Sequence, residues 1–259
     1  MVEYALYVNR LEDLKKHFDV EKYQGIYFGN EFCENLIPSV DEVLEAIRFS
    51  LDFNVGFTFT TPYVTNKGLK RLKLILEKIS RFGCEIVFND WGFFNILKEF
   101  FSGLEFVMGR LLVKYPRDPR ILNYFDRLPK DTIEYYRKTN LTIDVVKEFL
   151  EKNGVKRIEF DNPLHQIEAN FSGFKKTLHY PYVYVTTTRL CLMSRDGLKG
   201  VSLGKCGKTC LKNVFTLKNP EMPITLIRKG NTIFYLNQEK PKNLEKIFDR
   251  VAVSPKIPI

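Results

Sequence analysis

Short apolar runs alternate with longer amphipathic segments along the first two thirds of the chain. Runs rich in β-branched and aromatic residues predict strands, and apolar positions at helical spacing predict the helices between them. The expected strands are 4–8, 25–28, 55–60, 84–88, 106–108 and 155–160, and the expected helices are 11–18, a helix opening at 38–41, 67–80, 92–101 and 142–152. Six βα units in the same sense predict an α/β fold of the (β/α) TIM-barrel type.

Polar residues follow several of these strands directly. Loops after the carboxyl ends of barrel strands build the functional site, so these side chains are expected to converge on one mouth. They are Asn30, Thr60, Asn89, Asp90, Arg110 and Asp161. His165, four residues after Asp161, could also approach the mouth, whereas Asn89 and Asp90 could equally be an ordinary helix cap. Glu159 alternates with apolar neighbours in its strand, so it is expected to face solvent or an ion pair rather than a second metal.

The alternation of strands and helices is interrupted at segment 111–128 and changes again beyond residue 171. Segment 111–128, rich in Pro, Arg and Asp, is an excursion from the regular alternation. Beyond residue 171, strands are expected at 182–187, 224–228 and 232–236, the last two joined as a hairpin at residues 229–231. We therefore expect one barrel-like domain over 1–259, with a cysteine-rich and β-rich insertion or extension at about 171–240.

Composition narrows the class of protein. The chain has 259 residues, 44% of them hydrophobic, which suits a single folded domain. The net charge of +9 allows contact with RNA or an acidic partner, but the basic residues are spread over helix faces, as is typical of solvated surfaces. No segment has the length and apolar character of a transmembrane span, and no secretion signal precedes the first strand, so a cytoplasmic location is expected. In that reducing compartment, clustered cysteines indicate metal ligands or redox groups.

Three of the five cysteines lie close together in the sequence. Cys191, Cys206 and Cys210 are separated by fourteen and three residues, and the last two lie in a Gly- and Lys-rich segment at 204–210 that has no apolar face to bury. Cys33, just past the second strand, is the candidate fourth ligand, whereas Cys84 opens the fourth strand and is expected to be an ordinary buried thiol. Four thiolates can hold either a four-iron cluster or structural zinc, and spacing alone does not decide between them.

Four segments carry a family resemblance: 27–33 after the second strand, 85–92 at the fourth, 108–110 at the fifth and 189–195 before the paired cysteines. With these segments the chain resembles peptidase family U32, the collagenase-like proteins, and most closely its UbiV-like branch, which partners UbiU in oxygen-independent ubiquinone biosynthesis. The resemblance implies a (β/α) barrel and a 4Fe-4S cluster on Cys33, Cys191, Cys206 and Cys210. Metal ligands other than these cysteines are not implied.

The resemblance also implies a class of activity. The expected function is that of a component of an oxygen-independent hydroxylation system, acting on a small aromatic substrate or quinone precursor, or on RNA, with a related family subunit as a heterodimer partner. Two alternatives remain open: a collagenase-like peptidase with zinc on the cysteines, and a non-catalytic binding subunit with a structural cluster or zinc. Segment 167–173 lacks the His-Gly pair of the larger peptidase-like members, and Leu190 separates Arg189 from Cys191, which ranks the peptidase lower.

Overall fold

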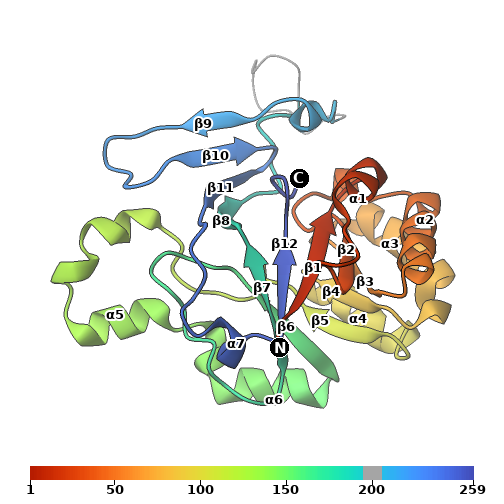
Figure 1. Cartoon of the computed structure of the whole chain (residues 1–259), viewed down its shortest axis with the longest axis horizontal. Helices are drawn as coiled ribbons and strands as arrows, with labels where there is room; N and C mark the ends of the chain where they lie inside the picture. The colour runs from red at the N-terminus through yellow and green to blue at the C-terminus, as the bar shows by residue number, and fades with distance from the viewer. Residues whose placement is uncertain (195–205) are drawn as a thin grey trace.

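Eight parallel strands close into a barrel in the computed structural model, which describes residues 1–194 and 206–259 (Figure 1). Around the barrel the order is β1-β12-β7-β6-β5-β4-β3-β2, and β2 returns to β1. The strands are β1 (Glu3–Val8), β2 (Gly25–Gly29), β3 (Gly56–Thr60), β4 (Glu85–Phe88), β5 (Glu105–Met108), β6 (Val155–Phe160), β7 (Lys175–Tyr180) and β12 (Arg250–Val253). The predicted α/β barrel is confirmed.

Five helices cover the outside of the barrel, namely α1 (Leu11–His17), α2 (Val40–Asp52), α3 (Asn66–Ile79), α4 (Trp91–Phe100) and α6 (Asp144–Lys152). Helix α5 (Lys130–Arg137) lies away from the barrel wall (Figure 1), and the short α7 (Leu244–Ile247) precedes β12. Ser39 begins α2 with a capping box, in which its hydroxyl accepts from the Glu42 N–H while the Glu42 carboxylate accepts from the Ser39 N–H. The predicted opening of this helix is thus explained by its cap.

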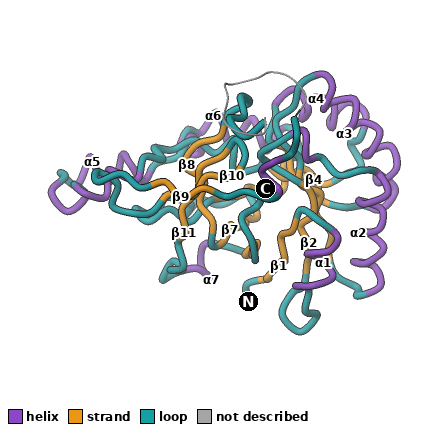
Figure 2. Tube along the Cα trace, turned by 90° about the horizontal axis from the view of Figure 1, so that it is seen from above, coloured by secondary structure: helices purple, strands orange, loops and turns teal. Residues whose placement is uncertain are grey.

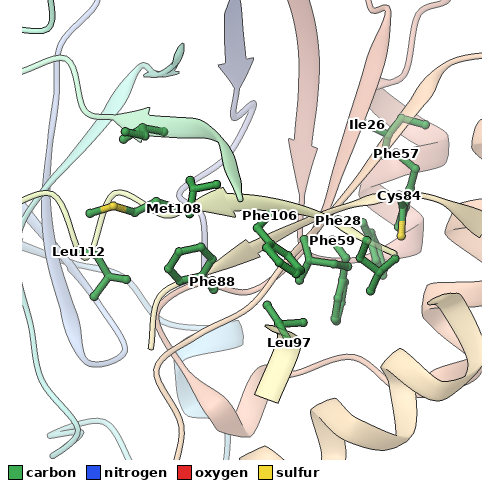
Figure 3. Close-up of a cluster of buried hydrophobic side chains, with 14 of the residues drawn as sticks. Ile26, Phe28, Phe57, Phe59, Cys84, Phe88, Leu97, Phe106, Met108 and Leu112 are labelled. Atoms are coloured by element: carbon green, nitrogen blue, oxygen red, sulfur yellow. The ribbon is translucent and has the colours of Figure 1, made fainter. Parts of the chain in front are cut away.

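The main hydrophobic core lies between the strands and these helices. Figure 3 shows part of it, where Phe28, Phe59, Phe88 and Phe106 pack in one layer. These side chains point outward from the barrel because successive residues of a strand face opposite sides. Their packing fixes the strands from outside and leaves the inner face to other residues.

The lumen of the barrel is polar. Arg157 on β6 donates to Glu85 on β4 at 3.0 Å, Arg250 on β12 also donates to Glu85, and Tyr27 on β2 shares a hydrogen bond with Thr177 on β7 at 3.3 Å. None of these three strand pairs is adjacent in the sheet, so each contact crosses the lumen.

A four-stranded antiparallel sheet, which we call the extension, lies beyond one end of the barrel (Figure 1). Its order is β8-β11-β10-β9, with β8 (Tyr182–Thr187), β9 (Phe215–Leu217), β10 (Leu226–Lys229) and β11 (Thr232–Leu236). The predicted hairpin is present, with Lys229 paired to Thr232 across the turn. β7 falls within the range 171–240 expected for an extension, yet it is a barrel strand.

In Figure 2, β8, β9, β10 and β11 lie together to one side of β1, β2 and β4. The chain leaves the barrel after β7, builds the extension, and returns to the barrel as β12. The extension therefore occupies the connection between two neighbouring strands of the barrel. Within the described residues, no helix is both long enough and apolar enough to span a bilayer.

Candidate metal centre at the barrel mouth

Cys33 lies in a tight loop directly after β2. Gly29 has φ = 130°, and a Cβ there would lie 2.2 Å from the Thr60 carbonyl oxygen, so the turn requires glycine. The Asn30 side chain then accepts from the N–H groups of Phe32 (3.0 Å) and Cys33 (2.8 Å). These two bonds hold the loop and place the Cys33 thiol at the C-terminal end of the barrel.

The three late cysteines lie in two turns that are tied together. The Ser194 N–H donates to the Cys191 carbonyl at 3.1 Å, and the Gly207 N–H donates to the Ser194 carbonyl at 3.0 Å. Cys210 lies in the one-turn helix Thr209–Leu211, and the Thr209 hydroxyl donates to the Met193 carbonyl. Gly204 and Lys205 of the predicted cysteine loop lie outside the described residues.

The structure brings the four predicted cysteines into one group. Burial, together with the nearby thiols of Cys210, Cys206 and Cys191, raises the pKa of the Cys33 thiol to about 11. Burial likewise raises the pKa of Cys191 and of Cys210, and the nearby Cys206 thiol acts in the same direction on both. A pocket of about 370 Å³ is lined by Cys33, Cys191 and Cys206.

Two basic side chains oppose this effect. Arg228 lowers the pKa of Cys191, and Lys229 lowers that of Cys210. Both belong to β10 of the extension. Positive charge next to thiols favours the thiolate, which is the form that binds metal.

Asn231 fastens the extension to the Cys33 loop. Its amide nitrogen lies 2.7 Å from the Phe32 carbonyl, 2.6 Å from the Thr188 carbonyl and 3.0 Å from the Tyr63 hydroxyl. The preceding Gly230, with φ = 59°, packs against Cys210, because a Cβ there would lie 3.4 Å from the Cys210 Cβ. The hairpin turn therefore contacts the Cys33 loop through Asn231 and contacts Cys210 through Gly230.

The spacing of the thiols bears on which metal suits them. Four thiolates on one zinc ion, each about 2.3 Å from it, lie about 3.8 Å from one another. In the described part of the chain, the one group of three or more ligand atoms within 4.8 Å of each other is Glu31, Glu159 and His179, and it includes no cysteine. No three of the cysteine sulfurs therefore lie within 4.8 Å of one another in this structure, and four thiolates can hold either a four-iron cluster or zinc.

Two of the predicted mouth residues form a buried ion-pair network. Arg110 donates to Asp161 at 2.8 Å and forms a two-pronged contact with Glu31, with its Nε 3.0 Å from one carboxylate oxygen. Arg117 donates to the second oxygen of Asp161 at 2.5 Å. Burial lowers the pKa of Arg110, but Glu31 and Asp161 outweigh that effect and keep the guanidinium charged.

The other predicted mouth residues have structural partners. Asn89 donates to the Thr61 carbonyl at 2.9 Å and accepts from the Leu111 N–H. Asp90 caps α4 by accepting from the Phe93 N–H at 3.0 Å, as the cap interpretation expected.

His165 is buried outside the mouth network. Its ring packs against Tyr115 at 5.9 Å and against Phe125 at 6.2 Å. Burial, together with the positive charges of Arg117 and Arg137, lowers its pKa to about 4. This histidine is therefore neutral near pH 7.

Cys84 lies apart from the other cysteines, as expected. It is buried in the main hydrophobic core, and Figure 3 shows it beside Phe57 at the edge of that cluster. Burial raises its pKa to about 12, so it stays a thiol.

Comparisons with known proteins support the fold. No family model matches the sequence, and no curated protein matches it. Among solved structures, the chain is similar to "The Structure of the U32 Peptidase Mk0906", with a TM-score of 0.51 and 14% sequence identity over 100% of this chain and 95% of that one. At this identity the likeness is one of fold, and it agrees with the barrel expected from the family resemblance.

Two residues of the lumen differ from the sequence-based expectation or lie outside it. Glu159 was expected to face solvent or an ion pair; it is fully buried, so it does not face solvent, and one of its carboxylate oxygens lies 3.0 Å from the Nε2 of His179. His179 on β7 was not singled out as a site residue. The available signal was the alternation of Thr177 and His179 with Lys176 and Leu178, which is a strand pattern whose polar face turns inward.

Proposed function

We propose that this chain is a U32-family protein that carries a 4Fe-4S cluster on Cys33, Cys191, Cys206 and Cys210. The observation that supports the proposal is the meeting of Cys33, from the barrel, with three cysteines of the extension, while the fifth cysteine lies in the core. When bound, such a cluster supplies one-electron transfer. The neighbouring Arg228 and Lys229 offset its negative charge and favour the thiolate form of its ligands.

The donor set fits the group in chemistry. Four thiolates are the usual ligands of a four-iron cluster. Cys33 and Cys210 are largely shielded from solvent, which protects a bound cluster from oxidation.

Anaerobic purification tests this proposal. Protein made together with a cluster-assembly system is expected to be brown, with four iron and four sulfide per chain and an EPR signal after reduction. Colourless protein without iron and sulfide, made under the same conditions, would refute the cluster. One equivalent of zinc in place of iron would instead support a structural zinc site.

The proposed role is that of a component of an oxygen-independent hydroxylation system, resembling the UbiV-like branch. Its proposed substrate is a small aromatic compound or quinone precursor, with RNA as the alternative. In anaerobic assays, the wild type together with its partner is expected to form hydroxylated product, and Cys33→Ala is expected to form none. Product formation by Cys33→Ala at the wild-type rate would separate the activity from the cluster.

A related family subunit is the proposed partner. Apolar side chains next to the cysteines are exposed to solvent, namely Leu190, Leu192 and Leu211, which supports a protein partner at this surface. Co-expression with a U32 homologue is expected to give a one-to-one complex by light scattering, and Leu192→Glu is expected to weaken it. A monomer under all conditions would contradict the partnership.

The peptidase alternative rests on the name of the structural neighbour, which is called a U32 peptidase. It predicts zinc at one equivalent and peptide cleavage that is lost on changing His165 or Glu168. In the structure His165 is buried against Tyr115 and Phe125, whereas Glu168 is exposed. Cleavage that survives both changes would leave no support for this alternative.

A further inference from the structure

The lumen of the barrel contains two layers of charged side chains. In the lower layer, at the N-terminal ends of the strands, Glu85 is paired with two arginines. In the upper layer, Arg110 bridges Glu31 and Asp161. Each of these carboxylates has a cationic partner, as buried charges require.

Two fully buried groups of the upper layer lack such partners. Glu159 on β6 is 0% exposed, and His179 on β7 is 1% exposed. Among the described residues, neither carboxylate oxygen of Glu159 and neither ring nitrogen of His179 has a hydrogen-bond partner. Because an unpaired polar group is costly to bury, four such atoms in adjacent side chains point to a missing ligand.

The geometry of these groups is that of ligands around one ion. The His179 Nε2 lies 3.0 Å from a Glu159 oxygen, yet the contact lacks hydrogen-bond alignment. With a carboxylate oxygen of Glu31, these atoms all lie within 4.8 Å of one another. Ligands bound about 2.1 Å from one metal ion lie about 3.0 to 3.4 Å apart, and their lone pairs point at the ion rather than at each other.

We propose that Glu31, Glu159 and His179 bind one divalent transition-metal ion inside the barrel, at a site separate from the four cysteines. One imidazole and two carboxylates form a donor set that suits Mn²⁺, Fe²⁺ or Zn²⁺ rather than a soft ion. Glu31 can serve as a ligand while it is paired with Arg110, because a carboxylate has about four lone-pair sites.

The charges of the site agree with a cation. Burial raises the pKa of Glu159 to about 8, and burial lowers the pKa of His179 to about 3. Both groups are therefore neutral near pH 7 when nothing else is bound. A dication stabilises the carboxylate, and it binds the imidazole in the neutral form that this environment already favours.

A pocket at the barrel mouth lies near this site. It has a volume of about 240 Å³, and its lining includes Tyr7 and Asn30. The Tyr7 ring packs edge-on against the His179 ring, with centroids 5.7 Å apart, and Asn30 directly precedes Glu31. The pocket lining therefore contacts the side chain of His179 through Tyr7.

Titration of the full chain with Mn²⁺, followed by EPR, tests the site. Mn²⁺ prefers oxygen and nitrogen ligands, so it discriminates against the thiols. We expect one Mn²⁺ per chain in the wild type and at least tenfold weaker binding in both Glu159→Gln and His179→Gln. Co²⁺, followed by its visible absorption, is the second probe.

The control variant is His165→Gln, which removes a buried histidine whose Nε2 is also unpaired but which lies outside the group. It is expected to bind Mn²⁺ as the wild type does. Circular dichroism establishes whether each variant is folded. If His179→Gln does not fold, Glu159→Gln carries the test, because it keeps the shape of the side chain.

Two outcomes would overturn the proposal. One is that neither Mn²⁺ nor Co²⁺ binds to folded wild type, in which case Glu159 and His179 are a neutral pair that shares a proton. The other is that binding is equal in the wild type and in both variants. Iron and sulfide content, measured on the same samples, reports on the cysteine site separately, so failure of one site is distinguishable from failure of the other.

Discussion

Cysteine has two different roles in this chain, and environment rather than residue type separates them. Cys84 is packed among aromatic and aliphatic side chains at the N-terminal end of β4. The other four lie where two loops and a hairpin meet, with basic side chains nearby. Single substitutions can therefore distinguish a packing thiol from a ligand.

Cys84→Ala is expected to keep the full iron content and to lower the free energy of unfolding by about 1–2 kcal/mol, because it leaves a small cavity. Cys210→Ala is expected to lose the cluster, because no other thiol is available to replace it. Iron and sulfide assays with thermal melts measure both effects. Equal loss of iron in the two variants would refute the assignment of ligands.

Asn231→Ala tests a positioning residue. The substitution leaves the Phe32 and Thr188 carbonyls without their donor, which is expected to cost about 1–3 kcal/mol. We expect iron to bind but to be released to a chelator several times faster than from the wild type. Asn213→Ala is the control, because its exposed side chain donates only to Thr209 in the same turn. Equal release rates would show that Asn231 does not support the Cys33 loop.

At the scale of elements, the six barrel strands β1 to β6 were predicted, including β6, whose inward residues Arg157 and Glu159 are polar. Segments 4–8 and 155–160 match β1 and β6 closely. β7 escaped prediction because no helix separates it from β6, so the alternation of strands and helices stops there. β12 begins with Arg250, another lumen residue, and is only four residues long.

The parts of the candidate site that could be predicted are those whose chemistry follows from the residue type alone. The four clustered cysteines and the mouth residues Arg110 and Asp161 were singled out from the sequence, and the structure brings each set together. Glu159 and Asn231 were not, because their roles depend on side chains distant in the sequence, including His179 and the Phe32 carbonyl. Only closure of the barrel brings these groups together.

The lower layer of the lumen gives β4 a pH-dependent link to β6 and β12. Burial raises the pKa of Glu85, but Arg250 and Arg157 outweigh it and lower the pKa to about 2. Because the folded pKa lies below the unfolded value of about 4.5, this ion pair stabilises the fold above pH 4.5, and the stabilisation is lost as the pH falls toward 2. The contribution is on the order of 3 kcal/mol.

Glu85→Gln is therefore expected to be less stable than the wild type at pH 7, with a difference that shrinks toward zero near pH 2. Denaturant unfolding across this pH range measures it. Glu45→Gln, which removes an exposed ion pair with Lys15, is the control and is expected to differ little from the wild type at every pH. A difference for Glu85→Gln that is constant with pH would contradict the link.

For the whole molecule, the cysteine site joins the barrel to the connection that contains the extension, two parts that also share hydrogen bonds such as Asn231 to Phe32 and Arg110 to Tyr182. Cys33 belongs to the barrel, and the other three ligands belong to the connection that contains the extension. A cluster bound by all four would tie the extension to the barrel mouth.

Loss of the cluster is expected to loosen the extension selectively. Hydrogen exchange in β8, β10 and β11 should become at least tenfold faster after chelation, while exchange in β3 and β4 stays unchanged. Mass spectrometry of peptides from anaerobic holoprotein and apoprotein measures this difference. Uniform acceleration over the whole chain would mean that the cluster stabilises the barrel as well.

The place of β12 in the barrel also affects how the protein is made. This strand pairs with β1 on one side and with β7 on the other, and it follows the whole extension in the chain. Until the ribosome has released residues 250–253, the nascent chain can form only an open sheet with β1 and β7 as unpaired edges. Such edges attract other chains, and the β1–β12 pairing is among the most distant contacts in the sequence, which slows folding. A chaperone that shields these two edges would therefore raise the yield of folded protein.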